Sequence, residues 1–137
     1  MNRSPRNEKL SVDIESAFPG SGSALSDQFI EMHPELASLQ GASTPPLLVL
    51  VPAYMAWCVR NSHRPEELVH DYTLNALAEF GRSKNPAIEH LNFKHLCSVK
   101  QQDVVAKFLS WCLDPTLLLH TEQIERALKH WAPAPSQ

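Results

Sequence analysis

The sequence contains little glycine and no surplus of positive charge, and both shortages exclude classes of function. Only four of the 137 residues are glycine, and none of them stands in a loop pattern that could cradle a phosphate group. The chain carries 12 Lys and Arg against 15 Asp and Glu, a formal net charge of -3, and its basic residues are scattered. Because binding to nucleic acid needs a basic stripe that displaces counterions, no nucleic-acid partner is expected.

Long apolar runs and paired cysteines are missing as well. The longest apolar stretch, residues 45–59, is interrupted by prolines and is shorter than the roughly 20 residues that a bilayer span needs. The polar start of the chain lacks the apolar run of a secretory signal. Three cysteines are an odd count, and Cys58 and Cys112 fall in apolar helical stretches where they are expected to be buried. We therefore expect a cytoplasmic protein with no membrane contact.

What is present is the composition of one ordinary globular domain. Hydrophobic residues make up 43% of the chain and charged residues 20%, far from the composition of disordered proteins. A chain of this length buries about two thirds of its unfolded surface, which is enough for a core without disulfides or metals. We predict a flexible N-terminal lead at residues 1–9, a single helical domain at 10–132 and a flexible tail at 133–137.

Helical spacing of polar residues is clearest between Ser98 and Asp114. Polar residues recur there at steps of three and four, and nearly everything between them is apolar. Ser98 and Gln101 have the spacing of a capping box at the start of this helix. The segment is therefore predicted to be a largely buried helix with one thin exposed stripe, formed by Lys100, Asp103, Lys107, Ser110 and Asp114.

A second segment, residues 47–61, is apolar on all sides until Arg60, and this pattern is typical of a central helix. Pro52 predicts either a kink or a helix that starts after it. A strand over 47–51 is the alternative, since a short apolar run does not distinguish the two by period alone. Tyr54 and Trp57 of this segment, with Phe108, are expected at the centre of the protein.

Shorter helical segments are predicted to dock on this helix, because helices of that length are unstable alone. Together they give an all-α fold, a compact bundle of about five to six helices around a central apolar helix. Residues 21–23 and 81–95 are predicted to be loops. The further helical segments are one capped by Ser11, one opened by Ser26, a turn from Pro34 to Gly41, a helix from Pro65 to Gly81 and a last helix that Thr121 caps and that reaches Trp131.

The histidines are the first candidates for metal or acid–base chemistry. Glu67 and His70 form one Glu-x-x-His pair after His63, but a metal site in a bundle needs this pair twice. These residues are interpreted as the solvated side of their helix. The segment 90–97 holds two histidines and Cys97 without the close paired spacing of zinc sites. No metal, cofactor or catalytic residue is predicted, and an enzyme or metal-binding protein using His63 to His70 or residues 90–97 is the alternative.

Three segments carry a resemblance to a known family. They are IESAFPG, VPAYMAWCVRN and LCSVKQQDVVAKFLSWCL, and the likeness covers residues 12–113. Their landmark residues are Ile14, Ala17, Phe18, Pro52, Ala53, Tyr54, Met55, Leu96, Gln102, Val105, Phe108 and Leu109. In this combination the chain resembles a family of small bacterial helical proteins known only as a domain of unknown function. Because that family has no established activity, the resemblance implies no functional residue.

The function expected from these patterns is protein binding without catalysis. The most concrete version is a cytosolic immunity or antitoxin-type inhibitor that occludes a toxin, because inhibition needs only a complementary surface. A small, mildly acidic helical bundle suits that role. The predicted partner-binding residues are the acidic side chains near the first helices, namely Asp13, Glu15, Glu31 and Glu35.

Overall fold

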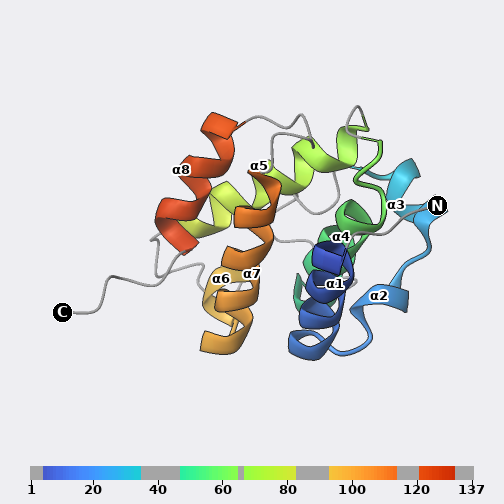
Figure 1. Cartoon of the computed structure of the whole chain (residues 1–137), viewed down its shortest axis with the longest axis horizontal. Coiled ribbons are helices and arrows are strands. Elements are labelled where there is room, and N and C mark those ends of the chain that lie inside the picture. Colours follow the sequence, from blue (N-terminus) through green and yellow to red (C-terminus); the bar gives the residue numbers. More distant parts are fainter. Residues whose placement is uncertain (1–4, 35–46, 65–66, 83–92, 114–120, 132–137) are drawn as a thin grey trace.

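The computed structural model describes residues 5–34, 47–64, 67–82, 93–113 and 121–131. All regular secondary structure within these ranges is helical, which confirms the all-α fold (Figure 1). Among the described helices, none combines the length and the apolar character that a membrane crossing requires. The helices are α1 (Pro5–Ala17), α2 (Ser21–Ala24), α3 (Asp27–Met32), α4 (Leu47–Arg60), α5 (Leu68–Arg82), α6 (Phe93–Leu96), α7 (Val99–Cys112) and α8 (Thr121–Trp131).

Helix α4 lies at the centre of the bundle, as its apolar sequence predicts. Every residue from Leu50 to Val59 is buried. The alternative strand over 47–51 is wrong, because those residues are helical. Pro52 lies inside the helix, which continues through it instead of starting after it. Since a proline lacks one N–H group, it removes one bond to the carbonyl four residues earlier, near the start of α4, and tight packing on all sides offsets that loss.

The other helices pack around α4 and around one another. α1 contacts both α4 and α7, while α8 contacts α5 and α7 (Figure 1). Phe93 of α6 joins these elements, because its ring lies 5.8 Å from that of Phe18, 5.9 Å from that of Phe80 and 5.8 Å from that of Trp131. Such aromatic contacts add to the free energy gained by burying the rings. A single core therefore runs through the described part of the chain.

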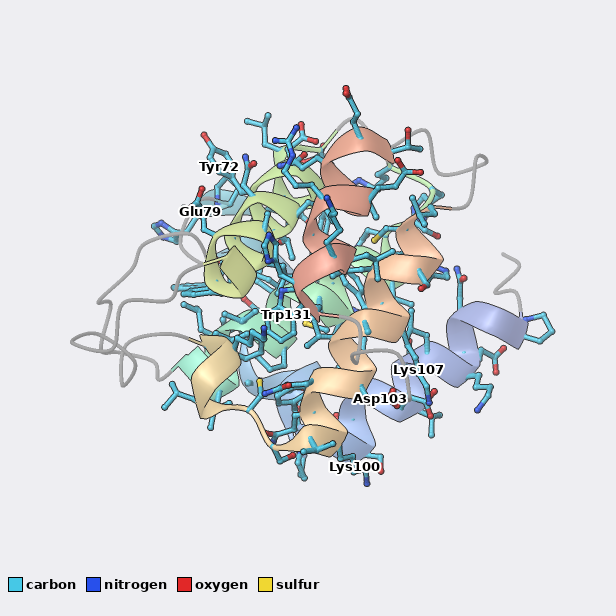
Figure 2. The ribbon with its side chains drawn as sticks, turned by 90° about the vertical axis from the view of Figure 1, so that its left-hand side faces the viewer. Tyr72, Glu79, Lys100, Asp103, Lys107 and Trp131 are labelled. Carbon is cyan, nitrogen blue, oxygen red and sulfur yellow. The ribbon has the colours of Figure 1, made fainter. Side chains whose placement is uncertain are left out.

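Helix α7 has the predicted cap. The Ser98 hydroxyl accepts a bond from the Gln101 amide at 3.2 Å, and the Gln101 side chain accepts one from the Ser98 amide at 2.8 Å. Both bonds satisfy amides that the helix itself leaves unpaired. Asp114 lies outside the described residues. The other members of the predicted stripe are exposed, namely Lys100, Asp103, Lys107 and Ser110. Figure 2 labels the first three of them.

The first helix begins earlier than predicted. α1 starts at Pro5, so residues 5–9 are helical and do not form a loose lead. Ser11 consequently lies inside the helix and does not cap it. Pro5 takes the first helical position, where its missing N–H would have had no partner. Asn7 fixes the first turn, since its side-chain oxygen accepts a bond from the Trp111 indole at 2.7 Å.

Other boundaries also differ from the sequence prediction, and residues 93–95 of the predicted loop are helical within α6. Residues 21–23 are helical within α2, because Gly20 takes the left-handed conformation with φ 85° and turns the chain after α1. Helix α5 begins at Leu68 and runs through Gly81 to Arg82. Thr121 is the first residue of α8. Three predicted features lie outside the described residues: the turn at 34–41 after its first residue, Pro65, and the tail at 133–137.

Candidate functional site

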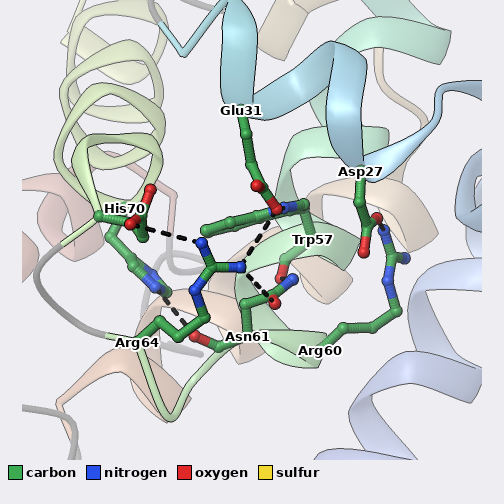
Figure 3. Close-up of polar contacts among 8 residues, drawn as sticks. Asp27, Glu31, Trp57, Arg60, Asn61, Arg64 and His70 are labelled. Atoms are coloured by element: carbon green, nitrogen blue, oxygen red, sulfur yellow. Dashed lines mark hydrogen bonds and ion pairs between the residues drawn. The ribbon is translucent and has the colours of Figure 1, made fainter.

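Polar side chains gather where α3 packs against the C-terminal half of α4 (Figure 3). The site lies beside the turn that leads from α4 into α5, so three helices position it. We call it the α3–α4 junction. Its residues are Asp27 and Glu31 of α3, Trp57 and Arg60 of α4, Asn61, Arg64 and Glu67 of the following turn, and His70 of α5.

The local sequence explains why α3 is helical here. Ser26 precedes the helix as its N-cap, and its hydroxyl accepts a bond from the Phe29 amide at 3.0 Å, as the sequence predicts. Ile30 is fully buried and anchors α3 to the core. Asp27 and Glu31 stand four residues apart, and helical geometry therefore places both carboxylates on one side of α3.

Glu31 is the shared acceptor of the junction. One of its carboxylate oxygens accepts a bond from the Trp57 indole at 3.0 Å and another from the Arg64 guanidinium at 3.2 Å. Arg64 also lies 3.4 Å from the Glu67 carboxylate and 5.7 Å above the Trp57 ring. The hydrogen bond to Glu31 raises the pKa of Arg64, so the guanidinium stays cationic. Two carboxylates and an aromatic face thus surround one cation.

Two further bonds tie α4 to α3 beside this cluster. The Arg60 guanidinium donates to Asp27 at 2.5 Å, and the Tyr54 hydroxyl donates to the backbone oxygen of His33 at 2.5 Å. Each carboxylate named in the junction is therefore bonded to or paired with Trp57, Arg60 or Arg64. The junction holds α3 against α4.

His70 is buried, which overturns its predicted place on a solvated face. Only 2% of its surface is exposed, and its ring centre lies 5.3 Å from that of Trp57. Its Nε2 atom lies 3.2 Å from the carbonyl oxygen of Asn61 and therefore donates the proton of that bond. The reason is the register of α5: His70, Thr73 and Leu77 follow at helical spacing and all face inward. That spacing is the signal in the sequence that could have identified it.

The first histidine set considered for metal binding, residues 63–70, is not brought together. His63 is exposed, and Glu67 is engaged by Arg64, while His70 points into the core. Of the second set, His90 lies outside the described residues and Cys97 is buried. No group of three His, Cys, Asp or Glu side chains suited to a metal ion exists within the part of the chain that the structure describes.

The predicted partner-binding acids have different surroundings. Asp13 is paired with Lys9 at 3.8 Å on the surface of α1. The Glu15 carboxylate accepts a bond from the Gly20 amide at 2.5 Å and so supports the turn after α1. Glu31 belongs to the α3–α4 junction, and Glu35 lies outside the described residues. Two of the four acids are thus engaged in holding the fold.

A small polar pocket lies between α5 and α8. Its volume is about 80 Å³. The Gln123 side chain donates to that of Asn75 across it. The pocket is lined by Asn75, Ala78, Glu79, Gln123, Arg126 and His130.

The three cysteines are free thiols, and all are buried. Burial raises the pKa of Cys58 to about 12 and that of Cys97 to about 12. Burial also raises the pKa of Cys112, and the nearby Cys58 adds to that shift. A nucleophilic thiol needs a lowered pKa and access to its substrate, so these groups act as small hydrophobic side chains, as the sequence predicts for Cys58 and Cys112.

The described residues therefore contain the hydrogen-bonded α3–α4 junction, three buried thiols and exposed helix surfaces. Comparison with protein-family models, with curated proteins and with solved structures finds no match to this chain. The family resemblance over residues 12–113 stays a prediction.

Proposed function

We propose that the chain is a non-enzymatic, cytosolic protein-binding module of the immunity or antitoxin type, which inhibits a toxin by covering part of its surface. The observation that carries this proposal is the outer face of α1. Glu8, Val12 and Glu15 follow there at helical spacing and are all exposed, with 65% of the Val12 side chain accessible. An apolar side chain between two carboxylates combines burial on binding with charge recognition.

The packing of α1 leaves this face available to a partner. Leu10, Ile14 and Ala17 point into the core, so the opposite face is not needed to hold the helix in place. Residues 5–34 contain five acidic and two basic side chains, a surplus that equals the formal net charge of -3 of the whole chain. A basic partner surface would approach such a region faster because of electrostatic steering.

The test is inhibition of the product of the neighbouring gene, co-expressed with this chain. We expect the chain to restore growth of cells that express that product and to form a stoichiometric complex with it. Glu8→Lys combined with Val12→Lys should weaken the complex by about tenfold or more, because the variant opposes a basic partner and loses the apolar contact.

A matched control keeps the charge change and the spacing but moves them to α8. Thr121→Lys combined with Glu125→Lys alters two exposed positions four residues apart and should leave both rescue and affinity unchanged. Absence of rescue and of a complex with the unmodified chain would count against the inhibitor proposal. Equal losses in both double variants would show that the α1 face is not the contact.

A further inference from the structure

The side chains that hold α3 form one row along α4 and the turn after it. Tyr54, Trp57, Arg60 and Arg64 follow at steps of three and four, and each donates a hydrogen bond toward α3 or the residue after it. The acceptors are the Asp27 and Glu31 carboxylates and the backbone oxygen of His33. Figure 3 shows both arginines reaching the carboxylates from below α3. In each of these bonds the donor belongs to the α4 side.

This donor row has the composition of a protein-binding hot spot. Tryptophan, tyrosine and arginine are the residues most enriched at the energetic centres of interfaces. The planar guanidinium groups of Arg60 and Arg64 match the geometry of carboxylates. Helix α3 supplies the complementary ligand, a six-residue helix with two carboxylates one turn apart and Ile30 as its buried apolar anchor.

Helix α3 is expected to need less free energy for its release than the helices around the core. A helix of six residues is unstable alone, and Ile30 is its single fully buried residue. The hydrogen bonds of α3 to α4 exchange for bonds to water on release, so each contributes little net free energy. The Arg60 and Asp27 side chains are 24% and 51% exposed, which weakens their attraction through solvent screening. Release of α3 is therefore expected to cost less free energy than global unfolding.

We propose that the donor row of Tyr54, Trp57, Arg60 and Arg64 is a recognition site for a short acidic amphipathic helix of a partner protein, and that α3 occupies this site in cis until such a helix displaces it. The partner helix needs carboxylates at positions i and i+4 with an apolar residue at i+3, the pattern of Asp27, Ile30 and Glu31. Because α3 is tethered, it competes at high effective concentration and lowers the apparent affinity for the partner. This site is separate from the α1 face.

The test uses a labelled peptide with the sequence of residues 25–34, LSDQFIEMHP, added to the full chain. Asp27→Asn and Glu31→Gln in the chain weaken the cis helix and leave the donor row intact. The peptide should bind this variant about tenfold more tightly than it binds the unmodified chain, as measured by fluorescence anisotropy. A control peptide with the same two neutral replacements should bind about tenfold more weakly than the acidic peptide.

Two further variants locate the binding. Adding Arg60→Gln and Arg64→Gln to the weakened chain should abolish peptide binding, whereas adding Arg126→Gln and Lys129→Gln on α8 should leave it unchanged. Equal affinity for the weakened and unmodified chains, or for the acidic and neutral peptides, would overturn the proposal. Dimers of the weakened chain without peptide would assign the site to a second copy and also overturn it.

Hydrogen exchange of the unmodified chain tests the release of α3 independently of the variants. It therefore decides the proposal even where the weakened chain does not fold. At the two ends of α3, the Ile30 amide donates to the backbone oxygen of Ser26 at 3.1 Å and the His33 amide donates to that of Phe29 at 3.0 Å. Release of α3 predicts that these two amides exchange faster than the central amides of α4. Protection equal to that of α4 would contradict the proposal. None of these measurements involves a toxin or α1, so their failure would leave the inhibitor proposal standing.

Discussion

The buried cysteine side chains make the free energy of unfolding depend on pH. In the unfolded chain a thiol ionises near its ordinary pKa of 9.0, whereas burial raises the pKa of Cys58 and of Cys97 to about 12. Between these values the unfolded state loses protons that the folded state keeps. The stability that the buried thiols contribute is therefore complete below pH 9 and is lost as pH rises toward 12.

We expect the free energy of unfolding to fall above pH 9, by up to about 1.4 kcal/mol per pH unit for each such thiol. Urea unfolding at pH 8 and at pH 10.5 measures this slope, and Cys97→Ala should reduce it even where the substitution lowers stability overall. At pH 8 the folded chain should react slowly with a disulfide reagent, and denaturant should release all three thiols. Rapid reaction of the folded chain would contradict the burial argument.

Single residues were predictable where their neighbours in sequence determine their surroundings. Cys58 and Cys112 stand in apolar runs, and burial follows from that pattern. Glu31 is different, because its donors Trp57 and Arg64 lie 26 and 33 positions away in the sequence. No local pattern marks it as part of the α3–α4 junction. The polarity of His70 favours a solvated face, whereas its helical spacing with Thr73 and Leu77 indicates burial, and the structure has it buried.

At the scale of elements, the capping residues at the start of α7 also connect this helix to the end of α1. The Gln101 side chain accepts a bond from Ser98 and donates another to the backbone oxygen of Ala17 at 3.0 Å. Ala17 is the last residue of α1, so this one side chain satisfies both a helix start and a helix end. A mutation at Gln101 therefore removes more than a cap.

We predict that Ser98→Ala lowers the free energy of unfolding by about 1 kcal/mol, the usual cost of losing an N-cap. Gln101→Ala should cost more, about 2 kcal/mol, because the bond to Ala17 is lost as well. Ser110→Ala is the matched control: it is an exposed position within the same helix, where alanine is favourable. Chemical denaturation measures all three, and equal effects of Ser98→Ala and Ser110→Ala would show that the cap does not contribute.

Elements with strong internal signals were placed correctly from the sequence. α7 has its capping box and its stripe, and α4 has its continuous apolar run. The boundaries of α1 and α2 were wrong, because the residues there are polar or small and their helical state depends on contacts made elsewhere. Residues 5–9 are helical in a fold that gives Asn7 distant partners, and such partners leave no trace in local spacing.

At the scale of the whole molecule, hydrogen bonds between residues far apart in the sequence connect the first turn of α1 to the rest of the fold. Asn7 accepts a bond from the Trp111 indole and donates one to the Ser62 hydroxyl at 3.2 Å, across 104 and 55 positions of sequence. These bonds connect the start of α1 to the end of α7 and to the turn after α4. The first turn of α1 thus belongs to the folded domain, which is why its removal should be felt globally.

A double-mutant cycle tests this connection. Asn7→Ala leaves the buried indole N–H of Trp111 without its acceptor and should cost about 1 to 3 kcal/mol. Trp111→Phe removes that donor, so Asn7→Ala should cost about 1 kcal/mol less in the Trp111→Phe background than in the unmodified chain. The coupling follows from one bond that both residues share. Strictly additive losses, or a chain without residues 1–9 as stable as the full chain, would instead place the N-terminal turn outside the cooperative unit.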